Sequence, residues 1–155
     1  MKLLARFLLP LVALLAGCAS TEVVLLKRPP PGASTEVLVF REWAFNQGGA
    51  NVRFGAEGKN IVVLGTSEFA TVQFAPGTYQ LFAQGNTGDP YVAALTLEKG
   101  KSRCVRVEPS PGNLGRAFVP FAWHIGHIFR FDERPCPTDE QLKSFKRVPV
   151  DYLPE

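Results

Sequence analysis

The chain has 155 residues, with 17 Lys and Arg, 14 Asp and Glu, and hydrophobic residues at 46% of positions. This length fits one domain of ordinary size and excludes a two-domain enzyme of standard build. The hydrophobic fraction excludes a chain that is disordered throughout. The formal net charge of +3 is too small and too scattered to indicate a nucleic-acid partner.

Residues 1–17 have the composition of a secretory signal. Lys2 and Arg6 precede an apolar run from Phe7 to Ala16, which matches the basic region and apolar core of such signals. The run is shorter than the about 20 apolar residues that cross a bilayer. We therefore expect this segment to direct export and to be cleaved.

The signal ends in Leu15-Ala16-Gly17-Cys18, which resembles the lipobox of bacterial lipoproteins. The resemblance implies that Cys18 becomes the acylated N-terminus, with palmitate among its acyl chains, since a single chain anchors only marginally. Ala19 stands where an aspartate would signal retention in the inner membrane. The resemblance therefore implies the periplasmic face of the outer membrane. Without the signal, the formal net charge falls from +3 to +1, because two of the cations are removed.

Residues 18–34 are expected to form the lipidated N-terminus and a tether. Pro29-Pro30-Pro31-Gly32 favours extended polyproline geometry. Ala19–Lys27 is nearly repeated as Ala33–Arg41, but a solenoid needs at least three copies. The apolar residues within 23–28 leave two alternatives open: they dock as an extra edge strand, or they remain part of the tether.

Short β-prone runs separated by turn residues fill the chain from residue 35 onward. Turn signals at Gly58-Lys59, Pro76-Gly77 and Gly100-Lys101 recur at a spacing typical of a sandwich or barrel. We predict an all-β domain over residues 35–150, an antiparallel β-sandwich of about seven to nine short strands. The predicted strands are 36–41, 51–55, 60–64, 70–74, 78–83, 92–97, 103–108, 117–122 and 127–131.

One short helix is predicted near the C-terminus, at about residues 139–147. Thr138 and Gln141 have the spacing of a capping box. Pro149 ends the helix, and Leu142 and Phe145 are expected on the side that faces the sheet.

Cys104 and Cys136 remain once Cys18 is assigned to the lipid. In an oxidising compartment we expect them to form one disulfide, which would attach the C-terminal tail to a strand. Closing a loop of about 33 residues contributes about 3–4 kcal/mol in the chain-entropy model. The alternative is a pair of buried free thiols. A thiol enzyme is not indicated, because no arrangement of Cys with His and Asn accompanies them.

Four segments stand in an order that resembles a family of small bacterial lipoproteins classed as a domain of unknown function and related in style to PEGA domains. They are Glu36–Arg41, Gly58–Leu64, Phe74–Leu81 and Leu97–Lys101. The resemblance implies a carboxypeptidase-regulatory-like, or transthyretin-like, β-sandwich in the cell envelope, and it implies no reaction. It covers residues 35–110, and residues 111–155 depart from the pattern.

Catalytic motifs were sought and not found. The sequence contains no Gly-x-Ser-x-Gly elbow and no His-Glu-x-x-His pair. Gly55–Asn60 faintly resembles a phosphate loop but lacks its spacing, so a hairpin turn explains it better. We therefore expect a protein that is not an enzyme and has no cofactor.

His124 and His127 are the only histidines, three residues apart. This spacing permits two metal ligands on one side of a turn, with Asp132 or Glu133 as a third ligand. Two ordinary histidines at a turn between strands are the favoured interpretation. A small-ligand or metal-binding module at this pair is therefore the alternative function.

Residues 117–131 combine aromatic side chains with arginine, a composition enriched at interaction hot spots. The same side chains would also serve as the core of a small sandwich. The candidate partner surface consists of Phe118, Phe121, Trp123, Arg116 and Arg130. We expect a membrane-anchored binding or scaffolding module whose partner is another envelope protein or a cell-wall component.

Overall fold

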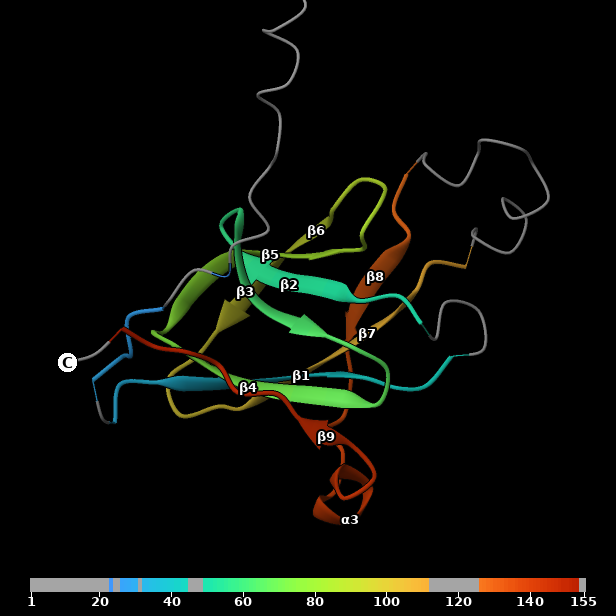
Figure 1. Cartoon of the computed structure of the whole chain (residues 1–155). Helices are drawn as coiled ribbons and strands as arrows, with labels where there is room; N and C mark the ends of the chain where they lie inside the picture. Colours follow the sequence, from blue (N-terminus) through green and yellow to red (C-terminus); the bar gives the residue numbers. More distant parts are fainter. Residues whose placement is uncertain (1–22, 24–25, 31, 45–48, 112–125, 154–155) are drawn as a thin grey trace, which may run out of the picture.

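A computed structural model describes residues 23, 26–30, 32–44, 49–111 and 126–153. Within these residues the chain forms nine strands in two sheets and one short helix, α3 (Asp139–Leu142) (Figure 1). The signal, Cys18 and the predicted strand 117–122 lie outside the described residues. The predicted two-sheet, mostly β architecture is confirmed.

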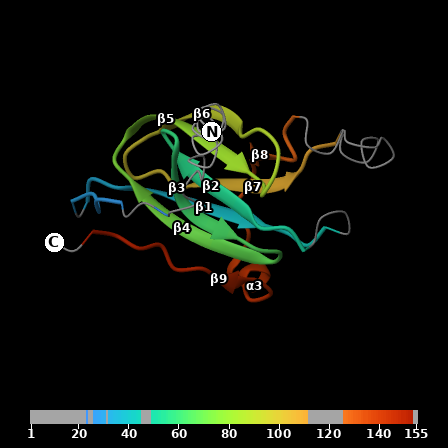
Figure 2. The ribbon, with the colours of Figure 1, turned by 45° about the horizontal axis from the view of Figure 1, so that its top comes forward.

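The first sheet has five strands in the order β8-β7-β1-β4-β9, and the second has four in the order β3-β2-β5-β6. The strands of the first sheet are β1 (Thr35–Arg41), β4 (Glu68–Phe74), β7 (Arg103–Pro109), β8 (Phe129–Glu133) and β9 (Lys146–Arg147). Those of the second are β2 (Val52–Ala56), β3 (Lys59–Leu64), β5 (Gly77–Gln84) and β6 (Tyr91–Leu97). Figure 2 shows the long strands of both sheets running in similar directions, with α3 outside them, as in aligned sheet packing.

The core lies between the inner faces of the two sheets. Ala70, Val72 and Phe74 of β4 are all buried, as their alternation with polar residues predicts. Leu81 and Ala83 of β5 meet them from the second sheet and are completely buried. The period-2 pattern therefore identifies the buried face correctly.

The prediction of purely antiparallel sheets is wrong for the first sheet. β1 pairs antiparallel with β4 but parallel with β7, and β4 pairs parallel with β9. Parallel neighbours require a long crossover connection, and residues 42–102 provide it by forming β4 and the whole second sheet. Side-chain alternation specifies which face is buried but carries no information on strand direction.

The β2–β3 hairpin confirms the turn expected at residues 55–60. Glu57 and Gly58 have positive φ values of 52° and 73°, as the tight turns of hairpins require. A Cβ on Gly55 would lie 2.1 Å from the Lys59 carbonyl oxygen and 2.5 Å from the Phe82 ring. The missing side chain therefore lets Phe82 pack over this strand and become buried on the outer face.

The predicted helix at 139–147 is too long. Only Asp139–Leu142 is helical, and its capping box is confirmed, because Thr138 and Gln141 exchange side chain–backbone hydrogen bonds. Residues 146–147 instead form β9. Phe145 packs edge-on against Phe40 of β1 with ring centroids 6.1 Å apart, so its predicted orientation toward the sheet is confirmed.

The C-terminal tail, residues 134–153, follows the edge of β4 and holds the tether. The N–H groups of Lys146 and Val148 donate to carbonyls on the β4 side at 2.9 and 2.8 Å. Farther along, Leu26 forms a parallel bridge with Tyr152, with two backbone hydrogen bonds of 3.4 and 2.8 Å. The Tyr152 hydroxyl accepts a hydrogen bond from the Gln73 N–H of β4 at 2.8 Å. The described part of residues 23–28 is thus docked by one bridge rather than by a full strand.

The sandwich has two different ends. The tether end, on the left in Figure 1, carries Leu26 and the β2–β3, β4–β5 and β6–β7 turns. The loop end, on the right, carries the β3–β4 and β5–β6 turns, the ends of β1 and β7, and the starts of β2 and β8.

Cys104 of β7 and Cys136 form a disulfide, with Cα atoms 5.0 Å apart and 32 residues apart in sequence. This confirms the predicted bridge and excludes the alternative of two free thiols. Because α3 has no buried residues, the disulfide is a principal attachment of the tail to the core.

Replacing both cysteines, Cys104→Ser with Cys136→Ser, is expected to lower the free energy of unfolding by about 3–4 kcal/mol, because the unfolded chain is no longer cross-linked. Urea unfolding of the oxidised protein and the variant measures this difference. In the variant, the amides of Lys146 and Val148 should gain more hydrogen exchange than that of Val39 in the core. Equal stabilities would show that the tail is attached without the disulfide.

Candidate functional site

A groove of ≈ 580 Å³ lies on the outer face of β1 and β7, between the loop end and the α3 tail. We call it the Trp43 groove. The residues that define it here are Phe40, Glu42, Trp43, Arg106, Arg134 and Phe145. A second hollow of ≈ 270 Å³ continues it along β7 to Pro111 and shares Glu42, Trp43 and Arg106 with it.

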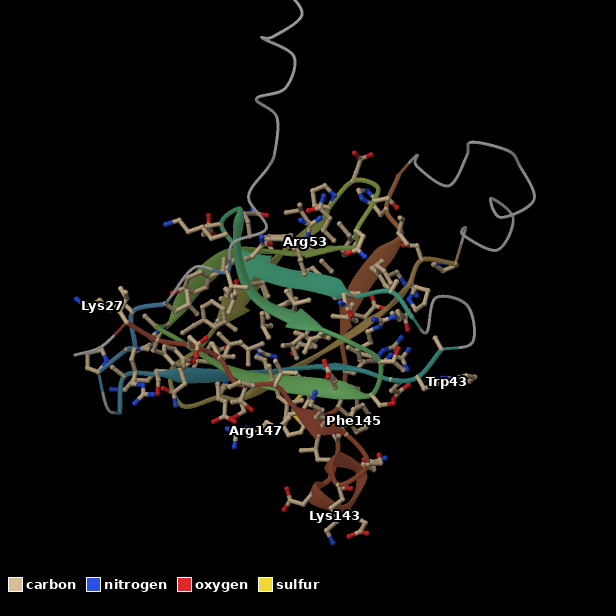
Figure 3. All side chains as sticks on the ribbon, in the orientation of Figure 1. Lys27, Trp43, Arg53, Lys143, Phe145 and Arg147 are labelled. Atoms are coloured by element: carbon tan, nitrogen blue, oxygen red, sulfur yellow. A yellow bond between two sulfur atoms is a disulfide. The ribbon has the colours of Figure 1, made fainter. Side chains whose placement is uncertain are left out.

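Trp43 is the most prominent side chain of this groove, with 65% of its surface exposed. It follows the end of β1, where the chain leaves the sheet, and Figure 3 shows it pointing away from the ribbon at the loop end. Tryptophan carries a large apolar surface and a hydrogen-bond donor, and for this reason it is enriched at interfaces. Its exposure at the wall of a groove makes this groove the candidate site.

Arg41, two residues earlier, has the opposite placement and is completely buried. Its guanidinium donates to the carbonyls of Ala50 and Leu64 and lies 4.8 Å above the Phe129 ring. Burial lowers the pKa of Arg41, and the nearby Glu68 carboxylate opposes that shift. Arg41 thus closes the loop end of the core directly behind the groove.

Charged side chains of alternating sign cover the outer face of β7 and β8 beside the groove. The members of this charge ladder are Glu42, Arg106, Glu108, Arg130, Asp132 and Arg134. At its centre Glu108 accepts hydrogen bonds from Arg106 and from the Arg130 Nε, the latter at 2.9 Å. The ladder is polar and nearly neutral, so it presents donors and acceptors rather than a field of one sign.

The central pair of the ladder stays ionised at neutral pH. Burial alone would raise the pKa of Glu108, but the hydrogen bonds and charges of Arg130 and Arg106 outweigh it, so that this pKa is lowered. The pKa of Arg130 is raised, chiefly by its hydrogen bond to Glu108. A general acid or base works best with a pKa near the operating pH. With these shifts, Glu108 and Arg130 are better suited to hydrogen-bond a polar partner as permanently charged groups than to transfer protons.

Only one member of the predicted partner surface is described. Phe118, Phe121, Trp123 and Arg116 lie outside the described residues. Arg130 belongs to the charge ladder, and the stretch 112–125 joins the described chain at Pro111, which lines the continuation of the groove. Arg130, the described member, therefore lies in the charge ladder beside the Trp43 groove.

The histidine pair is also described only in part. His124 lies outside the described residues, whereas His127 is exposed and its ring contacts Tyr91 edge-on, with centroids 5.7 Å apart. Asp132 and Glu133, the suggested third ligands, form ion pairs with arginines. In the part of the chain that the structure describes, no three His, Cys, Asp or Glu side chains are grouped as metal ligands.

Comparison with protein-family models, with curated proteins and with solved structures found no match for this chain. Among the described residues, no helix has the length and apolar character needed to cross a membrane. The described side chains therefore carry the information on function.

Acidification is expected to weaken the fold partly through Glu108. A carboxyl with a lowered pKa in the folded state contributes stability above its unfolded pKa, and this is lost as the pH falls through the folded pKa. The free energy of unfolding should therefore fall less steeply in Glu108→Gln than in the wild type when urea unfolding is measured from about pH 6 to about pH 3. The control Glu140→Gln, on the exposed surface of α3, should keep the wild-type slope. Parallel curves for wild type and Glu108→Gln would contradict this role.

Proposed function

We propose that the protein is a lipid-anchored lipoprotein of the bacterial envelope that binds a partner through the Trp43 groove and is not an enzyme. The observation that supports binding most strongly is the exposed Trp43 beside a groove bordered by Phe145 and the charge ladder. Exposed aromatic residues with arginine are the typical anchors of protein interfaces. The proposed partner is another envelope protein, with a cell-wall glycan as the other possible result of the experiment below.

Two features support export and anchoring. The Cys104–Cys136 disulfide suits an oxidising, extracytoplasmic compartment. Leu15-Ala16-Gly17-Cys18 supplies the pattern for cleavage and acylation at Cys18. On this proposal the mature chain begins at Cys18, carries palmitate, and faces the periplasm from the outer membrane.

The proposed kinship with PEGA-like and carboxypeptidase-regulatory-like domains is supported by the two-sheet architecture over residues 35–110. The resemblance does not imply two features of this chain, the parallel pairing of β1 with β7 and the disulfide-linked tail. The proposed relationship implies no catalytic activity, so it is consistent with a binding role.

The anchor is tested by metabolic labelling with a palmitate analogue. Wild type should acquire the label and fractionate with the outer membrane, whereas Cys18→Ser should acquire none. The double variant Cys104→Ser with Cys136→Ser should keep the label, because these two cysteines are joined to each other. Label retained on the Cys18→Ser protein would refute the anchor.

Partner binding is tested in cells by a photoreactive amino acid placed at Ser144 on the groove wall. Wild type should give one discrete crosslinked protein product, and Trp43→Ala should reduce it at least about tenfold, as loss of a hot spot does. The matched control is Val92→Ala, an exposed apolar residue of β6 with 51% exposure. An unchanged product in Trp43→Ala, or an equal loss in Val92→Ala, contradicts the groove. Product released by a muramidase would assign the partner to the cell wall.

A further inference from the structure

An apolar groove of ≈ 590 Å³ lies at the tether end, between the docked tether and the β2–β3 and β4–β5 turns. Its apolar lining includes Leu26, Pro29, Ala56, Phe74 and Tyr79. Its cationic rim consists of Lys27, Arg28 and Lys59, all of which are exposed, and the exposed Glu57 also lines the groove. The groove therefore combines an apolar floor with positive charge at its edge.

The same end of the sandwich carries further positive charge. Lys99 and Lys101 lie in the β6–β7 turn, which is joined to β1 by a hydrogen bond from the Thr35 Oγ1 to the Glu98 carbonyl at 2.7 Å. The acidic side chains of this end are Glu36, Glu57, Glu98 and Asp151, so the five cations Lys27, Arg28, Lys59, Lys99 and Lys101 outnumber them by one. This excess equals the formal net charge of +1 of the whole mature chain.

The docking of Leu26 shortens the tether. Leu26 follows Cys18 by eight positions, and a fully extended chain of eight steps reaches about 26–29 Å. Had the tether remained undocked as far as Thr35, its reach would be about twice as long. The cation–π contact of Arg28 with Tyr152, 5.0 Å from the ring centroid, holds one of the rim cations at this point.

We propose that the tether end is a membrane-binding surface for anionic phospholipid. Lys27, Arg28 and Lys59 contact the phosphate headgroup, and the apolar groove accommodates part of an acyl chain. A molecule with an anionic head and an apolar chain matches both halves of the surface, and juxtamembrane cations gain from negative lipid surfaces. The location rests on the proposed anchor at Cys18, but the surface itself is formed by described residues and is testable without the lipid.

The test uses the unlipidated mature polypeptide, residues 18–155 with Cys18→Ser and the disulfide intact. It should sediment with vesicles that contain phosphatidylglycerol and not with vesicles of phosphatidylcholine alone. Each cation near an anionic surface contributes about fivefold to partitioning. The triple variant Lys27→Gln, Arg28→Gln, Lys59→Gln should therefore partition about a hundredfold more weakly. Lys59→Gln alone, which leaves the docked tether untouched, should lose about fivefold.

The matched control is Lys143→Gln with Lys146→Gln, which removes two lysine charges on the tail, compared with Lys27→Gln and Lys59→Gln on the rim. Figure 3 shows Lys27 at the tether end and Lys143 beside α3, and Lys146 pairs with Glu68 at the start of β4. The control should lose less than about threefold, reflecting net charge alone, whereas the rim pair should lose about twenty-fivefold. Equal losses in the two double variants, or no preference for phosphatidylglycerol, would overturn the proposal.

The acyl component is tested by amide chemical shifts with soluble dihexanoyl phosphatidylglycerol and, separately, with glycerol 3-phosphate. The short-chain lipid should shift Leu26, Ala56 and Phe74, and glycerol 3-phosphate should affect only the rim cations. Identical shifts from both compounds would exclude the acyl groove. If binding fails while palmitate labelling of Cys18 succeeds, this surface is wrong and the anchor stands. If the protein binds vesicles but Cys18 takes up no palmitate label, the anchor alone is refuted.

Discussion

The Cys104–Cys136 disulfide holds a tail that buries little surface of its own. α3 has no buried residues and β9 is exposed, so this segment depends on the covalent bond, on the Phe145–Phe40 contact, on the packing of Val148 and Val150 against the core, and on a few hydrogen bonds to the β4 edge. The tail in turn places Tyr152, which holds the tether at Leu26. This one bond therefore supports the position of the tail and of Leu26 in the docked part of the tether.

This arrangement gives the sandwich two ends with different chemistry. The tether end combines an apolar groove with a cationic rim, whereas the loop end carries Trp43 and the charge ladder. Arg41 lies between the loop end and the core, where its buried guanidinium donates hydrogen bonds to the carbonyls of Ala50 and Leu64. The proposed anchor at one end and the proposed recognition groove at the other would together hold a partner away from the bilayer.

Short sequence patterns correctly predicted the features that depend on interactions between neighbouring residues. The alternation of Ala70, Val72 and Phe74 specified the buried face of β4, and Thr138 with Gln141 specified the start of α3, because both signals act over a few residues. The parallel pairing of β1 with β7 and the two-residue β9 depend on where the chain returns. The Trp43 groove was not predicted, because it joins residues near positions 40, 106 and 145. The one sequence feature that could have indicated it is a tryptophan placed directly after a strand, outside the alternating pattern that buries side chains in the core.

The orientation of the domain is tested most directly by hydrogen exchange of the lipidated protein in phosphatidylglycerol vesicles, compared with the unlipidated mature chain in solution. Amides at 26–28, 57–60 and 98–102 should exchange more slowly on the vesicles, while those at 42–44 and 106–108 keep their solution rates. Slower exchange at 42–44 and 106–108, or equal rates throughout, would contradict a domain that lies on its tether end.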